Sequence, residues 1–384
     1  MKRLVIAMPL LLIFAGWFSL ASRAQLAFQP EEYLILLGIY HQQSLAAYST
    51  PDSSLSYQAE LRATIADSVG LSSGVKLWYR SPDVGLSNSW DLWLQGDTLA
   101  IVSIRGTVNR PDSWLENFWA AMVPAQGQWQ INDSTRFTYR LATDPRAAVH
   151  AGWLLGMASI APDVVHHLHQ IYAHGIRQVI ITGHSQGGVI SYLLAAYLHY
   201  LPDPLIADSL QYQVYASAAP RPGNLYFAYD FDHVFQGKAF HIVNPEDWVP
   251  QTPLSVQTLQ DMTAVNPFHD VNSLFHQGNW LVRWYLRQQF HKLEKRTRKA
   301  SSMMTTFFGS KIQKAVKRYL PQLQTPQYVS STEYVAAGQP IVLKPDSHYF
   351  NRAVFNGHNY FVHHALSAYA YLVKTNFVGH LTTP

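Results

Sequence analysis

The sequence contains no cysteine, and only 14% of its 384 residues are charged. Without cysteine there are no disulfide bonds, no thiolate chemistry and no lipid-modified cysteine, so an apolar core must hold the fold unaided. Beyond the N-terminus, no apolar run is long enough to cross a bilayer. The length suits one large α/β domain with an insertion, or two modest domains.

The first 24 residues have the pattern of a secretory signal peptide. Lys2 and Arg3 precede an apolar run from Leu4 to Ala21, and Ser22-Arg23-Ala24 offers small residues for cleavage. We expect export, to the periplasm or the medium, after cleavage. Because the apolar run is long, a membrane tether formed by an uncleaved anchor is the alternative. Residues 25–384 are then expected to form a single domain.

Positive charge is concentrated in the segment 283–318, where Glu294 is the only acid. Without this segment the rest of the chain is mildly acidic, so the sequence does not predict a nucleic-acid-binding protein. The cations are Arg283, Arg287, Lys292, Lys295, Arg296, Arg298, Lys299, Lys311, Lys314, Lys317 and Arg318.

The stretch Gly183-His184-Ser185-Gln186-Gly187 lies between two strongly patterned segments. Gln178 to Ile181 is a β-branched apolar run, typical of a buried parallel strand, and Val189 to Tyr200 is an Ala/Leu-rich helix. A serine between glycines on a sharp strand-to-helix turn is the G-x-S-x-G nucleophile elbow of α/β-hydrolases. The pattern therefore predicts Ser185 as a nucleophile, with a helix N-terminus that stabilises developing negative charge.

An earlier strand pair is expected to complete this site. Ser89 to Gln95 and Thr98 to Ile104 flank a Gly-Asp turn and predict antiparallel strands. The second strand ends in Arg-Gly-Thr. In an α/β-hydrolase, a loop of this kind supplies one amide of the oxyanion hole, and the residue after the nucleophile supplies the other. Thr107 and Gln186 are the candidate donors.

Residues 109–122 predict a helix capped by Asn109, with large apolar side chains on one face. One interpretation is an amphipathic helix that faces the core. The other is a mobile lid or acyl-chain wall beside the oxyanion loop, in which Trp114, Phe118 and Trp119 contact substrate.

The triad acid of such a fold lies in a loop after a strand downstream of the serine. Ala239 to Val243 predicts that strand, so Asp247 is the candidate, with the adjacent Glu246 as an alternative. His150 is expected to be a structural hydrogen-bonding residue. No spacing of histidines and acids predicts a metal site, and no cofactor is expected.

Five motifs, in chain order, together resemble the class 3 (fungal-type) lipase family of the α/β-hydrolase superfamily. The resemblance covers roughly residues 95–255 and resumes near the C-terminus. It implies a predominantly parallel central sheet with helices on both faces, and the roles given above for Ser185, Asp247, Thr107 and Gln186. The motifs are Arg105–Thr107, Val149–Trp153, Gly183–Gly188, Pro220–Asn224 and Val243–Pro250.

The family's catalytic histidine usually opens a late helix in a pattern like His-x-Leu-x-x-Tyr. His364 to Tyr369 matches this pattern, on a helix expected over Val362 to Leu372. The resemblance therefore implies His364 as the catalytic base, with His363 and His358 as alternatives.

The chain departs from the minimal family pattern at about residues 263–346, an insertion before His364 that we expect to be helical. Its aromatic residues alternate with the cations of 283–318. One interpretation is a solvated helical hairpin that packs its aromatics on the core. The other is an interfacial element that contacts an anionic membrane surface.

Together these features predict a secreted serine esterase or lipase that hydrolyses acylglycerols or related lipids through an acyl-enzyme. Within the same class, a phospholipase A1, a non-lipid carboxylesterase or an acyl-transfer enzyme is the alternative. From another class, the alternative is a non-catalytic lipid- or envelope-binding module, since fold alone does not establish function.

Overall fold

The computed structural model describes residues 27–47, 74–268 and 280–378. The predicted signal peptide lies outside these ranges. Among the described residues, no helix is both long enough and apolar enough to cross a membrane.

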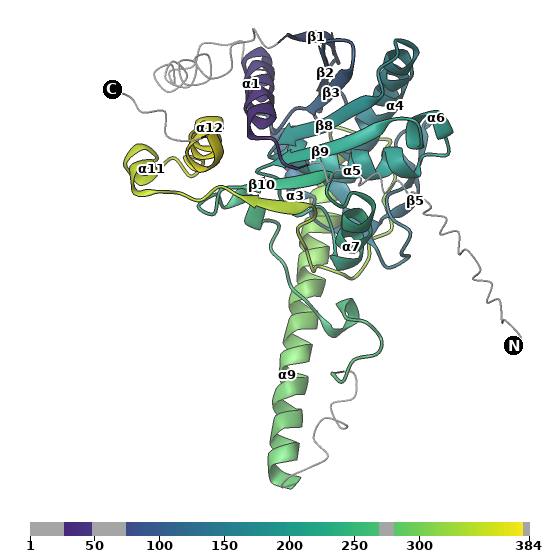
Figure 1. The fold of residues 1–384 in the computed structure, drawn as a ribbon. Helices are drawn as coiled ribbons and strands as arrows, with labels where there is room; N and C mark the ends of the chain where they lie inside the picture. Colours follow the sequence, from purple (N-terminus) through teal and green to yellow (C-terminus); the bar gives the residue numbers. More distant parts are fainter. Residues whose placement is uncertain (1–26, 48–73, 269–279, 379–384) are drawn as a thin grey trace, which may run out of the picture.

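A seven-stranded sheet forms the centre of the molecule (Figure 1). Its first three strands are antiparallel, and from β3 onward each neighbouring pair is parallel. This confirms the predicted predominantly parallel sheet. In spatial order the strands are β1 (Val75–Arg80), β2 (Trp90–Gln95), β3 (Leu99–Ile104), β8 (Gln178–His184), β9 (Gln211–Ser217), β10 (Ala239–Val243) and β11 (Gln339–Val342).

Helices cover both faces of the sheet, because successive strand residues point to opposite sides. Ile180 of β8 packs into a cluster with α1 and α12, whereas Val179 and Ile181 pack with α4 and α5. The α/β-hydrolase fold is thereby confirmed. These four helices are α1 (Pro30–Ala47), α4 (Ala151–Ala173), α5 (Gln186–Tyr200) and α12 (Leu366–Val373).

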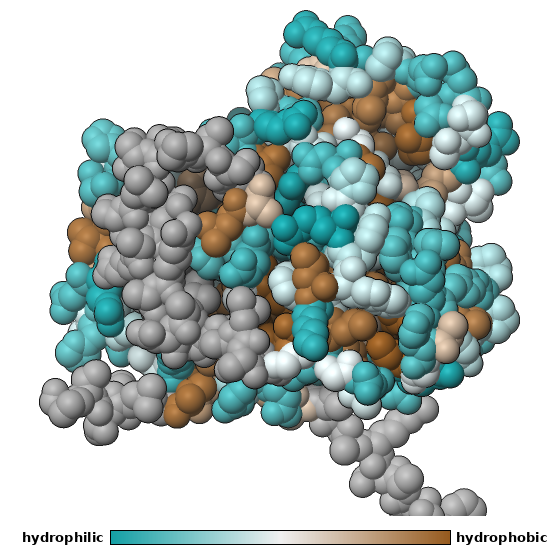
Figure 2. Space-filling model, turned by 90° about the horizontal axis from the view of Figure 1, so that it is seen from above, coloured by the Kyte–Doolittle hydropathy of each residue, from teal (hydrophilic) through white to brown (hydrophobic). Residues whose placement is uncertain are grey.

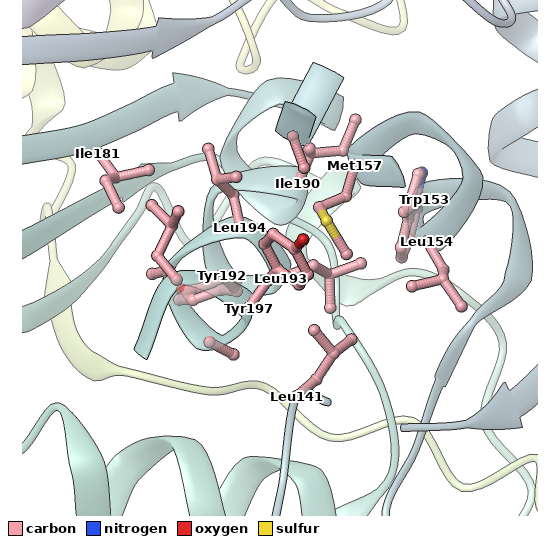
Figure 3. Close-up of a cluster of buried hydrophobic side chains, with 14 of the residues drawn as sticks. Leu141, Trp153, Leu154, Met157, Ile181, Ile190, Tyr192, Leu193, Leu194 and Tyr197 are labelled. Atoms are coloured by element: carbon pink, nitrogen blue, oxygen red, sulfur yellow. The ribbon is translucent and has the colours of Figure 1, made fainter. Parts of the chain in front are cut away.

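The larger core lies around α5 (Figure 3). Ile190 and Leu193 of α5 contribute to one fully buried cluster with Leu154 and Met157 of α4 and Ile181 of β8. All five side chains are at most 1% exposed. A helix that is apolar on nearly every side must be buried, and this holds α5, which begins directly after Ser185, rigidly in place.

Shorter elements complete the body. Two small antiparallel sheets pair β4 with β7 and β5 with β6. The remaining elements are α3 (Pro111–Phe118), β4 (Met122–Pro124), β5 (Gln126–Gln130), β6 (Arg136–Arg140), β7 (Ala148–His150), α6 (Pro204–Ala207), α7 (Leu225–Val234), η2 (Val249–Gln251), η3 (Leu259–Asp261), α11 (Ser347–Arg352) and η5 (Lys374–Val378).

The segment 263–346 is helical only in part. Helix α9 (Trp280–Thr305) runs without a turn into a π-helical segment, η4 (Thr306–Lys311), and then α10 (Ile312–Val316). Because the described helical residues of this segment follow one another from Trp280 to Val316 with no reversal of the chain, the helical-hairpin interpretation is wrong. The end of the segment instead supplies β11, an edge strand of the central sheet.

Helix α9 projects from the body (Figure 1), and aromatic side chains near its first residue are exposed. Trp280 and Trp284 are 66% and 57% exposed, so they are not packed on the core of the described chain. By contrast, the face seen from above in Figure 2 mixes hydrophilic residues with scattered hydrophobic ones. The exposed aromatics of α9 therefore need an explanation other than core packing.

We predict that α1 is an integral part of the fold, because its inner face is fully buried. Leu37, which is 0% exposed, packs against α12 and the sheet. Leu37→Ala should lower the free energy of unfolding by about 2–5 kcal/mol, as for other buried leucines. Thermal or urea unfolding measures this change. Glu31→Ala, on the exposed side of the same helix, should cost less than about 1 kcal/mol, and an equal effect of the two changes would contradict the packing of α1.

Candidate active site

Ser185 lies at the sharp turn between β8 and α5, with φ 61° and ψ −126°, a backbone conformation that non-glycine residues rarely adopt. Glycines allow the turn. A Cβ at Gly183 would lie 2.3 Å from the backbone of Gly187, and a Cβ at Gly187 would lie 2.0 Å from the carbonyl oxygen of Ile104. Only glycine permits these approaches, and they hold the Ser185 side chain at the carboxyl end of the sheet.

The loop after β3 lies directly beside this turn. In the parallel β3–β8 register Ile104 is paired with Gly183, so Gly106 and Thr107 come next to Ser185. A Cβ on Gly106 would approach the carbonyl oxygen of His184 to 2.8 Å. The Arg105 guanidinium fixes the loop from behind by donating to the Ser87 carbonyl at 2.8 Å. Thr107 and Gln186, the candidate donors, line the same cavity, and Gln186 is the first residue of α5.

Asp247 and His364 form a buried pair. The ring Nδ1 of His364 donates to Oδ2 of Asp247 at 2.6 Å, which leaves Nε2 as the free ring nitrogen. Asp247 also accepts from the backbone N–H of Val249 (3.0 Å) and from the Tyr369 hydroxyl (2.8 Å). Burial opposes ionisation of Asp247, but these donors, His364 first, lower its pKa below the ordinary value.

The alternatives left open by the sequence lie elsewhere. Glu246 is exposed, next to Asp247 but pointing to solvent. Nδ1 of His363 is hydrogen-bonded to the Tyr349 hydroxyl (2.8 Å), and His358 is exposed. One detail of the prediction is wrong, because α12 starts at Leu366 and His364 lies in the turn before it. Tyr369 belongs to the same His-x-Leu-x-x-Tyr pattern, but the sequence did not reveal that its hydroxyl donates to Asp247.

Ser185 and His364 line one cavity of about 570 Å³. Its walls are mostly apolar and come from segments far apart in the chain. Aromatic rings form part of its wall: Trp114 and Trp248 contact Phe361 with ring centroids 6.2 and 5.3 Å apart, and Phe361 lies 5.8 Å from the His364 ring. A nucleophile and a histidine–carboxylate pair in an apolar cavity suit acyl transfer to and from an apolar molecule.

The helix expected over residues 109–122 is shorter than predicted and carries its polar side chains inward. Helix α3 ends at Phe118, its N-cap is Arg110 rather than Asn109, and Met122 belongs to β4. Trp114 and Phe118 line the cavity, and their contact with substrate stays a prediction. Trp119 does not: it is fully buried and donates its indole N–H to the Tyr328 hydroxyl at 2.9 Å, so its inclusion in the substrate-contacting wall was wrong.

His150 is a structural residue, as expected. Its Nε2 donates to the carbonyl of Asn117 (3.1 Å), and its Nδ1 accepts from the backbone N–H of Trp153 at the start of α4 (3.3 Å). Asn117 in turn donates to the Thr107 hydroxyl at 2.8 Å. His150 therefore supports the loop after β3 through Asn117.

A chain of buried hydrogen bonds links α1 to His364. The carbonyl of His364 can only accept, so Nε2 of His184 is the donor in their 2.9 Å contact. Nδ1 of His184 then accepts from the Ser217 hydroxyl (2.9 Å), which lies 2.6 Å from the Tyr33 hydroxyl. Burial, and then the neighbouring His364, lower the pKa of His184 to about 3, so its ring is neutral. Sequence reasoning missed this chain, because its members are distant in sequence.

The inner face of α3 carries a buried carboxyl beside Gln186, the residue that follows Ser185. Glu116 is 0% exposed and accepts from the side-chain amides of Asn88 (2.6 Å) and Gln186 (2.9 Å). Burial outweighs these bonds, and Asp112 adds repulsion, so the pKa of Glu116 rises to about 8. Glu116 ties the position of α3 to the residue that follows Ser185.

The fold and this geometry define an α/β-hydrolase with a serine and a histidine–aspartate pair at one cavity. Residues 101–257 match the family model described as lipase (class 3). The chain is 34% identical over 103 residues to a secreted mono- and diacylglycerol lipase 3 of Gibberella zeae, and 40% identical over 105 residues to a secreted mono- and diacylglycerol lipase of Malassezia restricta.

These matches cover 26% and 27% of this chain, and the chain spans 32% and 33% of the length of the two relatives. Among solved structures, it is similar to mono- and diacylglycerol lipase from Aspergillus oryzae, at 18% identity over 59% of this chain and 75% of that chain, with a TM-score of 0.40. Lipase II from Rhizopus niveus gives 21% identity over the same shares of the two chains, 59% and 75%, with a TM-score of 0.41.

We predict that Glu116 makes stability depend on pH. Its pKa is about 8 in the folded protein, against an ordinary value of 4.5, so between these values the folded state binds more protons than the unfolded state. The contribution of Glu116 to the free energy of unfolding is fully present below about pH 4.5 and is lost as pH rises through 8. Glu116→Gln removes this loss. The melting temperature of the variant, relative to wild type, should therefore increase from pH 5 to pH 9.

The test is how the difference in melting temperature changes with pH. Replacing the carboxyl by an amide also alters the hydrogen bonds with Asn88 and Gln186, but this effect is the same at every pH. Asp97→Asn, in the exposed turn between β2 and β3, is the control and should leave the profile close to that of wild type. A Glu116→Gln curve parallel to wild type over this range would contradict the prediction.

Proposed function

We propose that the protein hydrolyses carboxylic esters of lipids through a covalent acyl-enzyme, with Ser185 as nucleophile. The observation that carries the proposal is the 2.6 Å bond between Asp247 and His364 at the cavity that Ser185 also lines. With Nδ1–H held by Asp247, Nε2 of His364 takes the Ser185 proton as the hydroxyl attacks the ester carbonyl, and then gives it to the leaving alcohol. In a second round of the same proton transfers, water attacks the acyl-enzyme and releases the acid.

The backbone amides of Thr107 and Gln186 stabilise the tetrahedral oxyanion in this mechanism. Both residues line the cavity, and Gln186 is the first residue of α5, whose N-terminal amides and dipole favour negative charge. One such donor typically lowers the barrier by about 3 kcal/mol. The Thr107 hydroxyl accepts from Asn117, so its own proton remains able to serve as a third donor.

For the substrate we propose acylglycerols. The apolar cavity and its aromatic lining suit an acyl chain, and the similar fungal proteins are named mono- and diacylglycerol lipases. Their description as secreted, together with the N-terminal pattern, supports export of this protein. A phospholipase A1 or a non-lipid carboxylesterase would use the same triad and differ only in the leaving group.

Ser185→Ala should lower ester turnover by several orders of magnitude, because the covalent step is lost while the fold is kept. The measurement is hydrolysis of an ester series from butyrate to palmitate, below and above each solubility limit, with diacylglycerol and phosphatidylcholine alongside. A fluorophosphonate probe should label wild type and not the variant. Near-normal rates in Ser185→Ala would exclude the mechanism, and absence of labelling in wild type would favour the non-catalytic binding module.

We further propose that α9 and α10 contact anionic lipid surfaces. Segment 283–318 presents exposed cations alongside aromatics such as Trp284 and Tyr285, which are 57% and 56% exposed. Basic helices with exposed aromatics bind lipid headgroups and insert rings at the boundary. This element joins the body at the cavity, which Phe308 lines, so the proposed contact would hold the cavity close to the lipid.

Neutralising exposed lysines of α9 should weaken vesicle binding. Each cation near an anionic surface contributes about 1 kcal/mol, so the triple change Lys292→Gln, Lys295→Gln and Lys299→Gln should weaken binding to phosphatidylserine-containing vesicles more than tenfold. Hydrolysis of a soluble short-chain ester should be unchanged. Sedimentation with vesicles at two salt concentrations gives the affinity and its electrostatic share.

A matched control removes the same net charge from the body, by changing the exposed residues Lys76, Lys238 and Lys344 to glutamine. Binding should fall much less in this variant. Equal losses in the two triple variants would assign the effect to overall charge and contradict a specific role of α9.

A further inference from the structure

One wall of the catalytic cavity comes from the insertion. Phe308 lines the cavity together with Ser185 and His364, although it lies in the π-helical segment at the foot of α9. Other parts of the wall come from α1, through Tyr40 and other residues, and from α3. The insertion is thus part of the site as well as an arm on the surface.

The π-helical segment is anchored firmly. A Cβ at Gly309 would lie 3.0 Å from the Cβ of Ala121 and 3.3 Å from the ring of Tyr328, so the backbone of this turn presses directly on the body. Val316, in the following α10, is fully buried in the main core, and α10 packs against α3. Phe308 is therefore carried on a rigid support and not on a freely moving arm.

Two neighbouring phenylalanines on this turn face different surroundings. Phe307 is 49% exposed, and Lys311 lies 5.8 Å from its ring centroid. Phe308 is half-buried and faces the cavity. Single π-turns are rare in proteins, and those that occur are often at functional sites. The extra residue shifts the helix register and redirects a side chain. Here the shift accompanies an aromatic ring at the cavity.

We propose that Phe308 is a specificity-determining residue that contacts the acyl chain of the substrate. The inference rests on the proposed ester hydrolysis and adds to it a residue from outside the region that matches the family model, which ends at 257. A short acyl chain stays near Ser185, whereas a long chain extends along the cavity wall. Phe308 therefore discriminates by chain length and takes no part in the chemical step.

The test is the ratio of kcat/KM for palmitate to that for butyrate esters. Phe308→Ala should lower this ratio about tenfold, the usual effect of losing one apolar contact in a binding pocket. Phe308→Leu, which restores apolar bulk, should recover most of it. Phe307→Ala is the matched control, an identical truncation one residue away on the exposed side, and should keep the wild-type ratio. Melting temperatures of all three variants separate these effects from unfolding.

A second readout does not depend on turnover. Binding of a fluorescent long-chain fatty acid should weaken in Phe308→Ala and not in Phe307→Ala. If the wild type hydrolyses no ester above the Ser185→Ala background, the proposed function fails, and fatty-acid binding alone decides the role of Phe308. An unchanged or increased ratio, or fatty-acid binding equal in Phe308→Ala and wild type, would overturn the assignment while leaving the triad intact.

Discussion

The close approach of three backbone segments at Gly183 and Gly187 is the constraint on which the site depends. A Cβ on Gly187 would lie 2.0 Å from the Ile104 carbonyl, so the N-terminus of α5, the end of β8 and the loop after β3 meet at one point. This meeting forces Ser185 into its strained conformation and brings Thr107 beside it. The surrounding core stabilises the strain, because α5 is buried on nearly every side and cannot relax outward.

Local chemistry made this part of the molecule predictable. Strand and helix patterns around Ser185, and the strand that leads to Asp247, depend on neighbouring residues, and the sheet follows them closely. Helix α3 was less predictable. Its pattern continues past Phe118, yet the helix ends there, and the Trp119 indole donates to Tyr328, about two hundred residues later in the chain. The inward Glu116 likewise reads as a solvent-facing residue until its partners Asn88 and Gln186 are known.

The insertion, and the residues that contact the Asp247–His364 region from α1 and α12, were also hard to predict, because they depend on contacts between distant parts of the chain. Nothing in the sequence of 280–305 distinguishes a projecting helix from one half of a hairpin, because the two differ in tertiary packing and not in propensity. The pocket wall at Phe308 depends on contacts of Gly309 with Ala121 and Tyr328. Tyr33 and Tyr369 come from near the two ends of the chain and meet the site only because α1 and α12 share one face of the sheet.

The electrostatics of the proposed mechanism require that His184 stay neutral. Its ring lies 4.6 Å from that of His364, and a charge there would oppose formation of the His364 imidazolium when Ser185 attacks. Burial and the proximity of His364 set the pKa of His184 at about 3, and its bonds to Ser217 and the His364 carbonyl satisfy both ring nitrogens in the neutral form. His184 can therefore hold the backbone of His364 without competing for its charge. The positive charge of the transition state then has one buried counterion, Asp247, whose lowered pKa keeps it ionised.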